Sequence, residues 1–167
     1  MGLNDKITER FQVTADISKQ EILNSIGHGK QRQLWTDFLV ATAINYKAIK
    51  ILGNRLETIR MPSMINPFRP YGKITIDIEE IESNKTNLKC EILPYDGILP
   101  IAIGLLIGFL TLWSIAAFWF ARDLNVLLMV VPSWIVFGLV IYLGYLYTKH
   151  GLRDYSKILI NEITRSK

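Results

Sequence analysis

The chain has 167 residues, of which 50% are hydrophobic and 20% charged, with a mean hydropathy of +0.23 and a formal net charge of +4. Two runs contain no Asp, Glu, Lys or Arg: 24 residues at 98–121 and 23 residues at 126–148. At about 1.5 Å per helical residue each run is roughly 35 Å long, which is enough to cross a hydrocarbon core of about 30 Å. This pattern excludes a soluble globular protein and predicts a membrane hairpin after a water-soluble part at 1–97.

The positive charge is concentrated at one end of the chain. Residues 1–97 carry 13 basic and 12 acidic side chains, whereas 149–167 carry 5 basic and 2 acidic ones. Short cytoplasmic flanks of membrane helices collect Lys and Arg. We therefore expect a basic cytoplasmic tail at 149–167, both termini in the cytoplasm and the turn at 122–125 on the far side. The expected partner of this charge is the lipid bilayer rather than a nucleic acid.

The first 46 residues predict a strand and a short helix. Residues 7–14 alternate with a period of two, which is typical of a half-buried strand. Ser18 and Glu21 have the spacing of a capping box, in which each side chain covers a free amide at a helix start. We expect about two helical turns that end at the glycines of 27–29. Residues 31–46 fit either a helix or a strand, and both interpretations stay open.

Two hairpins are predicted next. Residues 48–51 and 55–61 flank Gly53-Asn54, a dipeptide that accepts positive φ in a tight turn. The two segments therefore predict a pair of antiparallel strands.

The second hairpin has a clearer alternation. Residues 73–78 place isoleucine on one side, and the pair at 79–80 interrupts this pattern as a bulge does. A polar turn is expected at 83–86, and residues 88–92 alternate on the return strand. Together these elements predict an α+β domain: one antiparallel sheet of about four or five strands with one or two helices against a face.

A resemblance lies on the segment Asn66-Pro67-Phe68-Arg69-Pro70-Tyr71-Gly72-Lys73-Ile74, followed by Lys85-Thr86-Asn87-Leu88 and the hairpin. It resembles a diffuse group of small bacterial membrane proteins, in which such an Asn-x-Phe-x-Pro segment with a following Gly opens a β-hairpin before two transmembrane helices. Many members have Gly-Thr where this chain has Lys85-Thr86. The resemblance covers about residues 60–120 and implies an architecture and a bacterial source, but no activity. It makes Asn66, Phe68, Pro70 and Gly72 candidate residues of the loop before the sheet hairpin.

Residues with catalytic or metal-binding chemistry are sparse. The two histidines, His28 and His150, belong to different segments, and Cys90 is the single cysteine. The sequence from Gly27 to Lys30 lacks the upstream glycine of a phosphate loop, and Gln31 stands where Ser or Thr would bind magnesium. We therefore expect no enzyme activity, no cofactor and no metal site. Asp77, Glu79, Glu80 and Glu82 form an acidic run that predicts a solvated sheet face.

The membrane runs contain small residues with spacings typical of helix packing. Gly104 and Gly108 form a Gly-x-x-x-Gly pair, and Gly138 and Gly144 leave gaps on the second helix. These glycines can serve the packing of the two helices on each other or the docking of another subunit. Pro132 is expected to kink the second helix.

The tail has two interpretations. It can continue the second helix, with Ile158, Leu159 and Ile163 covering the sheet, or form an amphipathic helix on the inner leaflet. We favour the continuation.

These observations predict a non-enzymatic protein of the bacterial inner membrane. Its cytosolic domain, tethered by the hairpin, would act as subunit or adaptor of a membrane assembly with a membrane-protein partner or a second copy of itself. The alternative is a self-contained immunity protein or a membrane-acting defence effector, and the sequence does not choose between the two.

Overall fold

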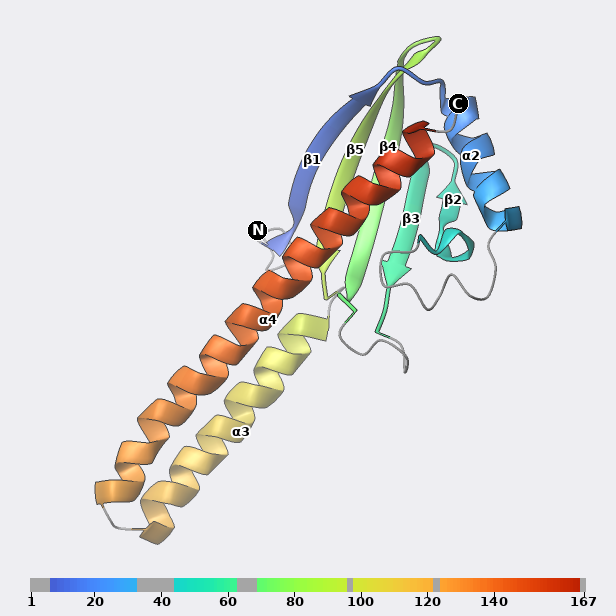
Figure 1. The fold of residues 1–167 in the computed structure, drawn as a ribbon. Helices are drawn as coiled ribbons and strands as arrows, with labels where there is room; N and C mark the ends of the chain where they lie inside the picture. Colours follow the sequence, from blue (N-terminus) through green and yellow to red (C-terminus); the bar gives the residue numbers. More distant parts are fainter. Residues whose placement is uncertain (1–6, 33–43, 63–68, 96–97, 122–123, 166–167) are drawn as a thin grey trace. The chain divides into compact units, whose positions relative to one another are not determined.

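A computed structural model describes residues 7–32, 44–62, 69–95, 98–121 and 124–165 (Figure 1). The chain forms two compact units. The first combines residues 1–96 with 148–167, and the second consists of residues 97–147.

The first unit is built on a five-stranded antiparallel sheet with strand order β1-β5-β4-β3-β2. The predicted α+β class is therefore confirmed. The strands are β1 (Glu9–Ala15), β2 (Lys50–Leu52), β3 (Arg55–Arg60), β4 (Gly72–Glu82) and β5 (Lys85–Pro94).

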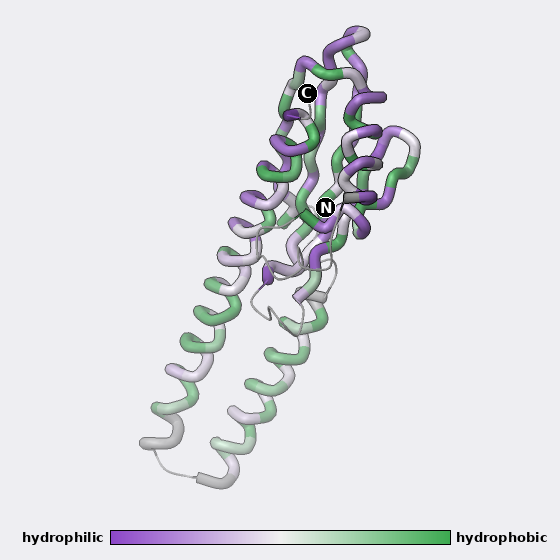
Figure 2. The backbone as a smooth tube through the Cα atoms, turned by 45° about the vertical axis from the view of Figure 1, so that its right-hand side comes forward, coloured by the Kyte–Doolittle hydropathy of each residue, from purple (hydrophilic) through white to green (hydrophobic). Residues whose placement is uncertain are grey.

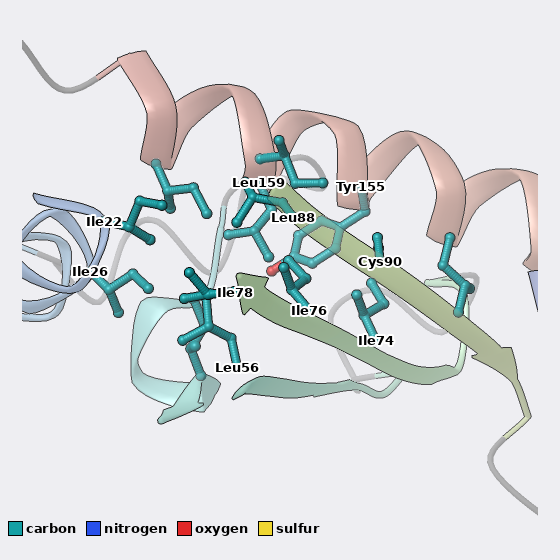
Figure 3. Close-up of a cluster of buried hydrophobic side chains, with 14 of the residues drawn as sticks. Ile22, Ile26, Leu56, Ile74, Ile76, Ile78, Leu88, Cys90, Tyr155 and Leu159 are labelled. Atoms are coloured by element: carbon teal, nitrogen blue, oxygen red, sulfur yellow. The ribbon is translucent and has the colours of Figure 1, made fainter. Parts of the chain in front are cut away.

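The central strands β4 and β5 carry most of the apolar core. Their register places Ile74 opposite Ile92, Ile76 opposite Cys90 and Ile78 opposite Leu88, and all six side chains are buried. Because side chains alternate across a strand, this set lies on one face of the sheet (Figure 3). The predicted inward side of the isoleucines is therefore confirmed.

The turns agree with the predictions except in detail. Gly53 has a φ of +62° in the two-residue turn between β2 and β3, a conformation that glycine adopts at no steric cost. The irregularity of β4 lies between Glu80 and Glu82 rather than at 79–80. The polar turn is shorter than predicted, because Lys85 and Thr86 already pair in the sheet.

Helix α2 (Lys19–Arg32) begins at the predicted capping box. The Ser18 backbone N–H donates to Glu21 Oε2 at 3.0 Å, and the Glu21 N–H donates to Ser18 Oγ at 3.3 Å. The predicted end at 27–29 is wrong, since the helix continues through both glycines. At Gly29 a Cβ atom would lie 2.5 Å from Cδ1 of Tyr46, so this position needs a glycine for packing and not for termination.

Of the ambiguous segment 31–46, residues 33–43 lie outside the described part of the chain. Asn45 precedes a 3-10 helix, Tyr46–Ala48, and its side chain accepts a hydrogen bond from the Ala48 N–H. This short turn leads directly into β2.

Helix α4 (Leu124–Arg165) contains the second apolar run and the whole described part of the basic tail in 42 residues. Its segment after residue 148 lies on the same face of the sheet as α2 (Figure 1). The predicted continuation is confirmed, and Leu159 and Ile163 are buried as expected. The prediction that Ile158 covers the sheet is wrong, because this side chain is 41% exposed. Leu152 and Tyr155 are buried instead.

Helix α3 (Ile98–Ala121) pairs with the first part of α4 in the second unit. Both helices are long and apolar enough to cross a membrane (Figure 2). Leu110 and Ala117 of α3 are buried, while large side chains around them such as Leu105 and Trp119 are more than 70% exposed. Such exposure of apolar groups separates these helices from the core helices of a soluble protein.

The two glycines of α2 give a matched test of this packing. Gly27→Ala meets open space and should stabilise the first unit by about 1 kcal/mol through helix propensity. Gly29→Ala should destabilise it by about 1–3 kcal/mol, because the Tyr46 ring must move. Urea unfolding of the two variants measures the difference, and equal shifts would contradict the assigned contact.

Candidate functional sites

The glycines of the membrane runs lie on open surface. Gly104 and Gly108 are exposed on α3, and a Cβ atom placed on either would meet no atom within 4 Å. Gly138 on α4 is equally open, and Gly144 is half-buried. Among the described residues, the structure therefore brings no neighbour against Gly104, Gly108 or Gly138.

The contact between α3 and α4 uses other residues. Along α3, Ile103, Leu106, Leu110 and Ala117 are the more buried positions, at the three- and four-residue spacing of a helix–helix seam. Trp134 Nε1 of α4 donates a hydrogen bond to Ser114 Oγ at 3.1 Å. The hairpin thus closes without the Gly-x-x-x-Gly pair.

A shallow apolar groove of about 740 Å³ lies on α4 around Pro132. It is lined by Leu128, Met129, Ser133, Val136 and Phe137, and it is largely open to the surroundings. Pro132 lies inside the helix, where it cannot donate the backbone hydrogen bond of its position.

The loop before the sheet hairpin meets α4 at close range. Asn66 and Phe68 lie outside the described residues. A Cβ atom at Gly72 would lie 2.5 Å from Cδ1 of Leu152, and one at Gly151 would collide with the Pro70 ring. Pro70 and Gly72 therefore have a packing role, because they let this segment lie close against α4.

Tyr155 is the polar centre of this packed region. Its ring is 4% exposed, the Arg60 guanidinium lies 4.1 Å from the ring centroid, and its hydroxyl accepts a hydrogen bond from the Asn45 N–H at 3.3 Å. Burial raises the pKa of the phenol, while the Asn45 amide, Arg60 and Arg69 act in the opposite direction. Sequence reasoning missed this cluster, because residues 45, 60 and 155 meet only in the folded chain.

A second polar contact holds α4 against the edge strand β1. Glu9 Oε1 lies 3.3 Å from Arg153 Nε, and Glu9 Oε2 lies 3.8 Å from Lys149 Nζ. The signal was available in the sequence, since Glu9 shares the inward side of β1 with Phe11 and Val13. Burying a carboxylate on an apolar face is costly unless a cation pairs with it, so its position predicts a cation on the element that covers this face.

The opposite face of the sheet is covered by ion pairs. Asp77 Oδ1 accepts a hydrogen bond from Arg55 Nε at 2.6 Å, and Glu79 Oε1 lies 2.5 Å from Lys89 Nζ. Asp77 and Glu79 are therefore neutralised locally and form the predicted solvated face. Exposed pairs of this kind contribute at most about 1 kcal/mol each.

Cys90 is buried in the core, and burial raises the pKa of its thiol to about 12, with a hydrogen bond to Ser156 acting in the opposite direction. Such a thiol is almost entirely protonated at neutral pH and is a poor nucleophile. The structure gives Cys90 a packing role.

Among the described residues no group of three or more His, Cys, Asp or Glu side chains could hold a metal ion. No protein-family model, curated protein or solved structure matches the chain. A sheet domain followed by two apolar helices agrees with the architecture that the resemblance implies, while no match confirms membership of a group.

The buried thiol makes stability depend on alkaline pH. Its pKa is about 9 when exposed and about 12 in the fold, so the folded chain binds more protons across this window. The contribution of the Cys90 thiol to the free energy of unfolding is fully present below pH 9. It is lost as the pH rises towards 12, by up to about 1.4 kcal/mol per pH unit.

Urea unfolding of the wild type and of Cys90→Ala at pH 8, 9 and 10 tests this. We expect a smaller fall in the variant between pH 9 and 10, independent of any constant offset from the lost side chain. Parallel curves would contradict the assignment.

Proposed function

We propose that this chain is a non-enzymatic subunit of a bacterial inner-membrane assembly, with α3 and α4 as its membrane anchor. The support is the apolar surface of both helices: Phe109, Leu112 and Phe118 are 59–69% exposed, and so are Val131 and Ile135 to a similar extent. Exposed side chains of this size are costly in water and favourable in lipid.

The proposed orientation places the sheet domain and both termini in the cytoplasm. Lys149, Arg153 and Lys157 follow the second apolar run within ten residues, whereas Arg122 is the single basic residue of the turn. An excess of basic residues next to a span favours the cytoplasmic side.

The surface that we assign to a partner is the face of α3 that carries Gly104 and Gly108. The observation that carries this assignment is their open surroundings, since a Cβ atom on either glycine meets nothing within 4 Å, while the hydrogen bond to α4 lies at Ser114. Two glycines four residues apart allow another helix backbone to approach closely, and in lipid this packing is a main source of helix association. The occupant is a membrane helix, either from another protein or from a second copy of the chain.

Single-cysteine labelling in intact bacterial cells tests the orientation. In a Cys90→Ala background, a cysteine at Asp123 should react with a membrane-impermeant maleimide, and cysteines at Lys85 or Ser166 should react only after lysis. Labelling at Lys85 from outside would reverse the proposed topology.

The glycine face is tested by Gly104→Ile combined with Gly108→Ile. Both changes raise hydrophobicity, so insertion should persist, while the branched side chains block a close helix contact. We expect crosslinking of the chain to its partner or second copy in native membranes to fall at least about tenfold, the equivalent of about 1.4 kcal/mol.

Ala102→Ile is the matched control, because it adds a branched side chain to an exposed position on another side of α3. It should leave crosslinking unchanged. If the double variant crosslinks as the wild type does, the glycine face is not the docking surface, and the self-contained immunity or effector role becomes the better proposal.

A further inference from the structure

Three strands of the sheet share the end at which β3 stops, β4 begins and β5 stops (Figure 1). At this end Arg60 of β3 pairs with Gly72 of β4, which pairs in turn with Pro94 of β5. We call it the Arg60 end, and it comprises residues 58–62, 69–74 and 92–95.

The Arg60 end is tied closely to the first apolar helix by the chain itself. Only three residues separate Pro94, the last residue of β5, from Ile98, the first residue of α3. Because an extended chain advances by at most about 3.6 Å per residue, their Cα atoms lie at most about 14 Å apart. The headgroup layer of a bilayer is about 5–8 Å thick on each side of the hydrocarbon core. If α3 enters that core at its first residues, the Arg60 end is therefore kept at the bilayer surface.

Apolar side chains are exposed at the Arg60 end. Ile59 is 38% and Met61 is 56% exposed. Ile59 pairs with Lys73, which pairs with Leu93, so these three lie on the sheet face opposite the buried core. Farther along this face the exposed side chains form ion pairs. Covering the apolar groups of the Arg60 end with lipid would remove them from water, which is favourable.

The charge of the Arg60 end matches an anionic surface. Its three segments contain Arg60, Arg69 and Lys73 and no acidic residue. The nearest acidic partner within the sheet is Glu57, which lies 3.0 Å from Lys73 Nζ. The opposite end of β4 and β5, residues 79–87, has three acidic residues and one basic residue. Basic residues near a cytoplasmic leaflet are attracted by its anionic lipids, so the charges favour the Arg60 end as the end that meets lipid.

Two tyrosines also lie at this end, and both are half-buried. The Tyr95 N–H donates a hydrogen bond to the Tyr71 carbonyl oxygen at 2.9 Å, and the Tyr95 hydroxyl accepts one from Thr148 Oγ1 at 3.0 Å. Tyrosine is enriched where proteins cross the membrane–water interface, because its ring is apolar and its hydroxyl is polar.

We propose that the Arg60 end binds the surface of an anionic bilayer, with Ile59 and Met61 inserted among the lipid headgroups. This inference rests on the membrane anchor proposed above and adds a second contact with lipid, made by the sheet domain itself. The sheet domain is then held at the membrane by its own surface as well as by its connections to the hairpin.

Quenching by spin-labelled lipid tests this contact in the full chain. A Cys90→Ala chain with one introduced cysteine is labelled with the fluorophore NBD and placed in nanodiscs of phosphatidylcholine and phosphatidylglycerol, in which some lipids carry a shallow nitroxide. The label at Met61→Cys should lose fluorescence, whereas the label at Ile81→Cys should not. Ile81 is the matched control, because it is also apolar and 56% exposed but lies near the opposite end of β4.

Ile101→Cys, on the exposed surface of α3, tests the anchor separately. Quenching at residue 101 without quenching at residue 61 overturns the surface contact and leaves the anchor intact. No quenching at residue 101 refutes the anchor, and with it this inference. Equal quenching at residues 61 and 81 also overturns the contact, because the label rather than the protein would then seek the lipid.

Two substitutions and a change of lipid test which groups make the contact. Ile59→Asp should reduce the quenching at residue 61, because a charged side chain disfavours insertion. Leu52→Asp should leave it unchanged, since Leu52 is 55% exposed and pairs with Arg55 at the other end of β3. Nanodiscs of phosphatidylcholine alone should quench residue 61 less, because the basic residues then lose their anionic partner. Equal effects of the two Asp substitutions, or equal quenching in both lipid compositions, would overturn the assignment of an anionic surface to this end.

Discussion

The sheet domain depends on the burial of α4 side chains against the inner faces of β4 and β5. Leu152, Leu159 and Ile163 are at most 1% exposed, and Tyr155 points from α4 towards the sheet together with Leu159 (Figure 3). Helix α2 contributes Ile22 and Ile26 to the same core. Burying a side chain of this size stabilises a fold by about 1.5–3 kcal/mol. The last turns of α4 therefore contribute to the stability of the sheet domain a free energy that α2 alone does not supply.

This arrangement makes the two ends of the chain parts of one core. The sheet begins at Glu9, and its last strand ends at Pro94. The α4 residues that complete its hydrophobic core come more than fifty positions later in the chain. The cations of α4 meet Glu9, which is the one carboxylate on the inward side of β1. Polar pairing and apolar burial thus hold the same helix on the same face, while the other face carries exposed ion pairs of small individual value.

The helical hairpin follows different rules from the sheet domain. Its two helices are joined by a side-chain hydrogen bond from Trp134 to Ser114, and many of its large apolar side chains are exposed. In lipid such surface needs no cover, and association is governed by how closely backbones can approach. The open glycines of α3 are therefore the part of this surface that we propose for contact with another helix.

Local patterns in the sequence determined much of this protein. The alternation at 7–14 and 73–78, the capping box and the charge-free runs each depend on neighbours within a few residues, and they predicted the strands, the start of α2 and both long helices. They failed at Gly27 and Gly29, because a glycine needed for the approach of Tyr46 looks the same as one that ends a helix. Only the tertiary structure decided which tail residues are buried, since Ile158 and Leu159 are equivalent until the sheet selects one side of α4. The stacking of Arg60 on Tyr155 was likewise decided there, because it joins two segments whose separation along the chain carries no local signal.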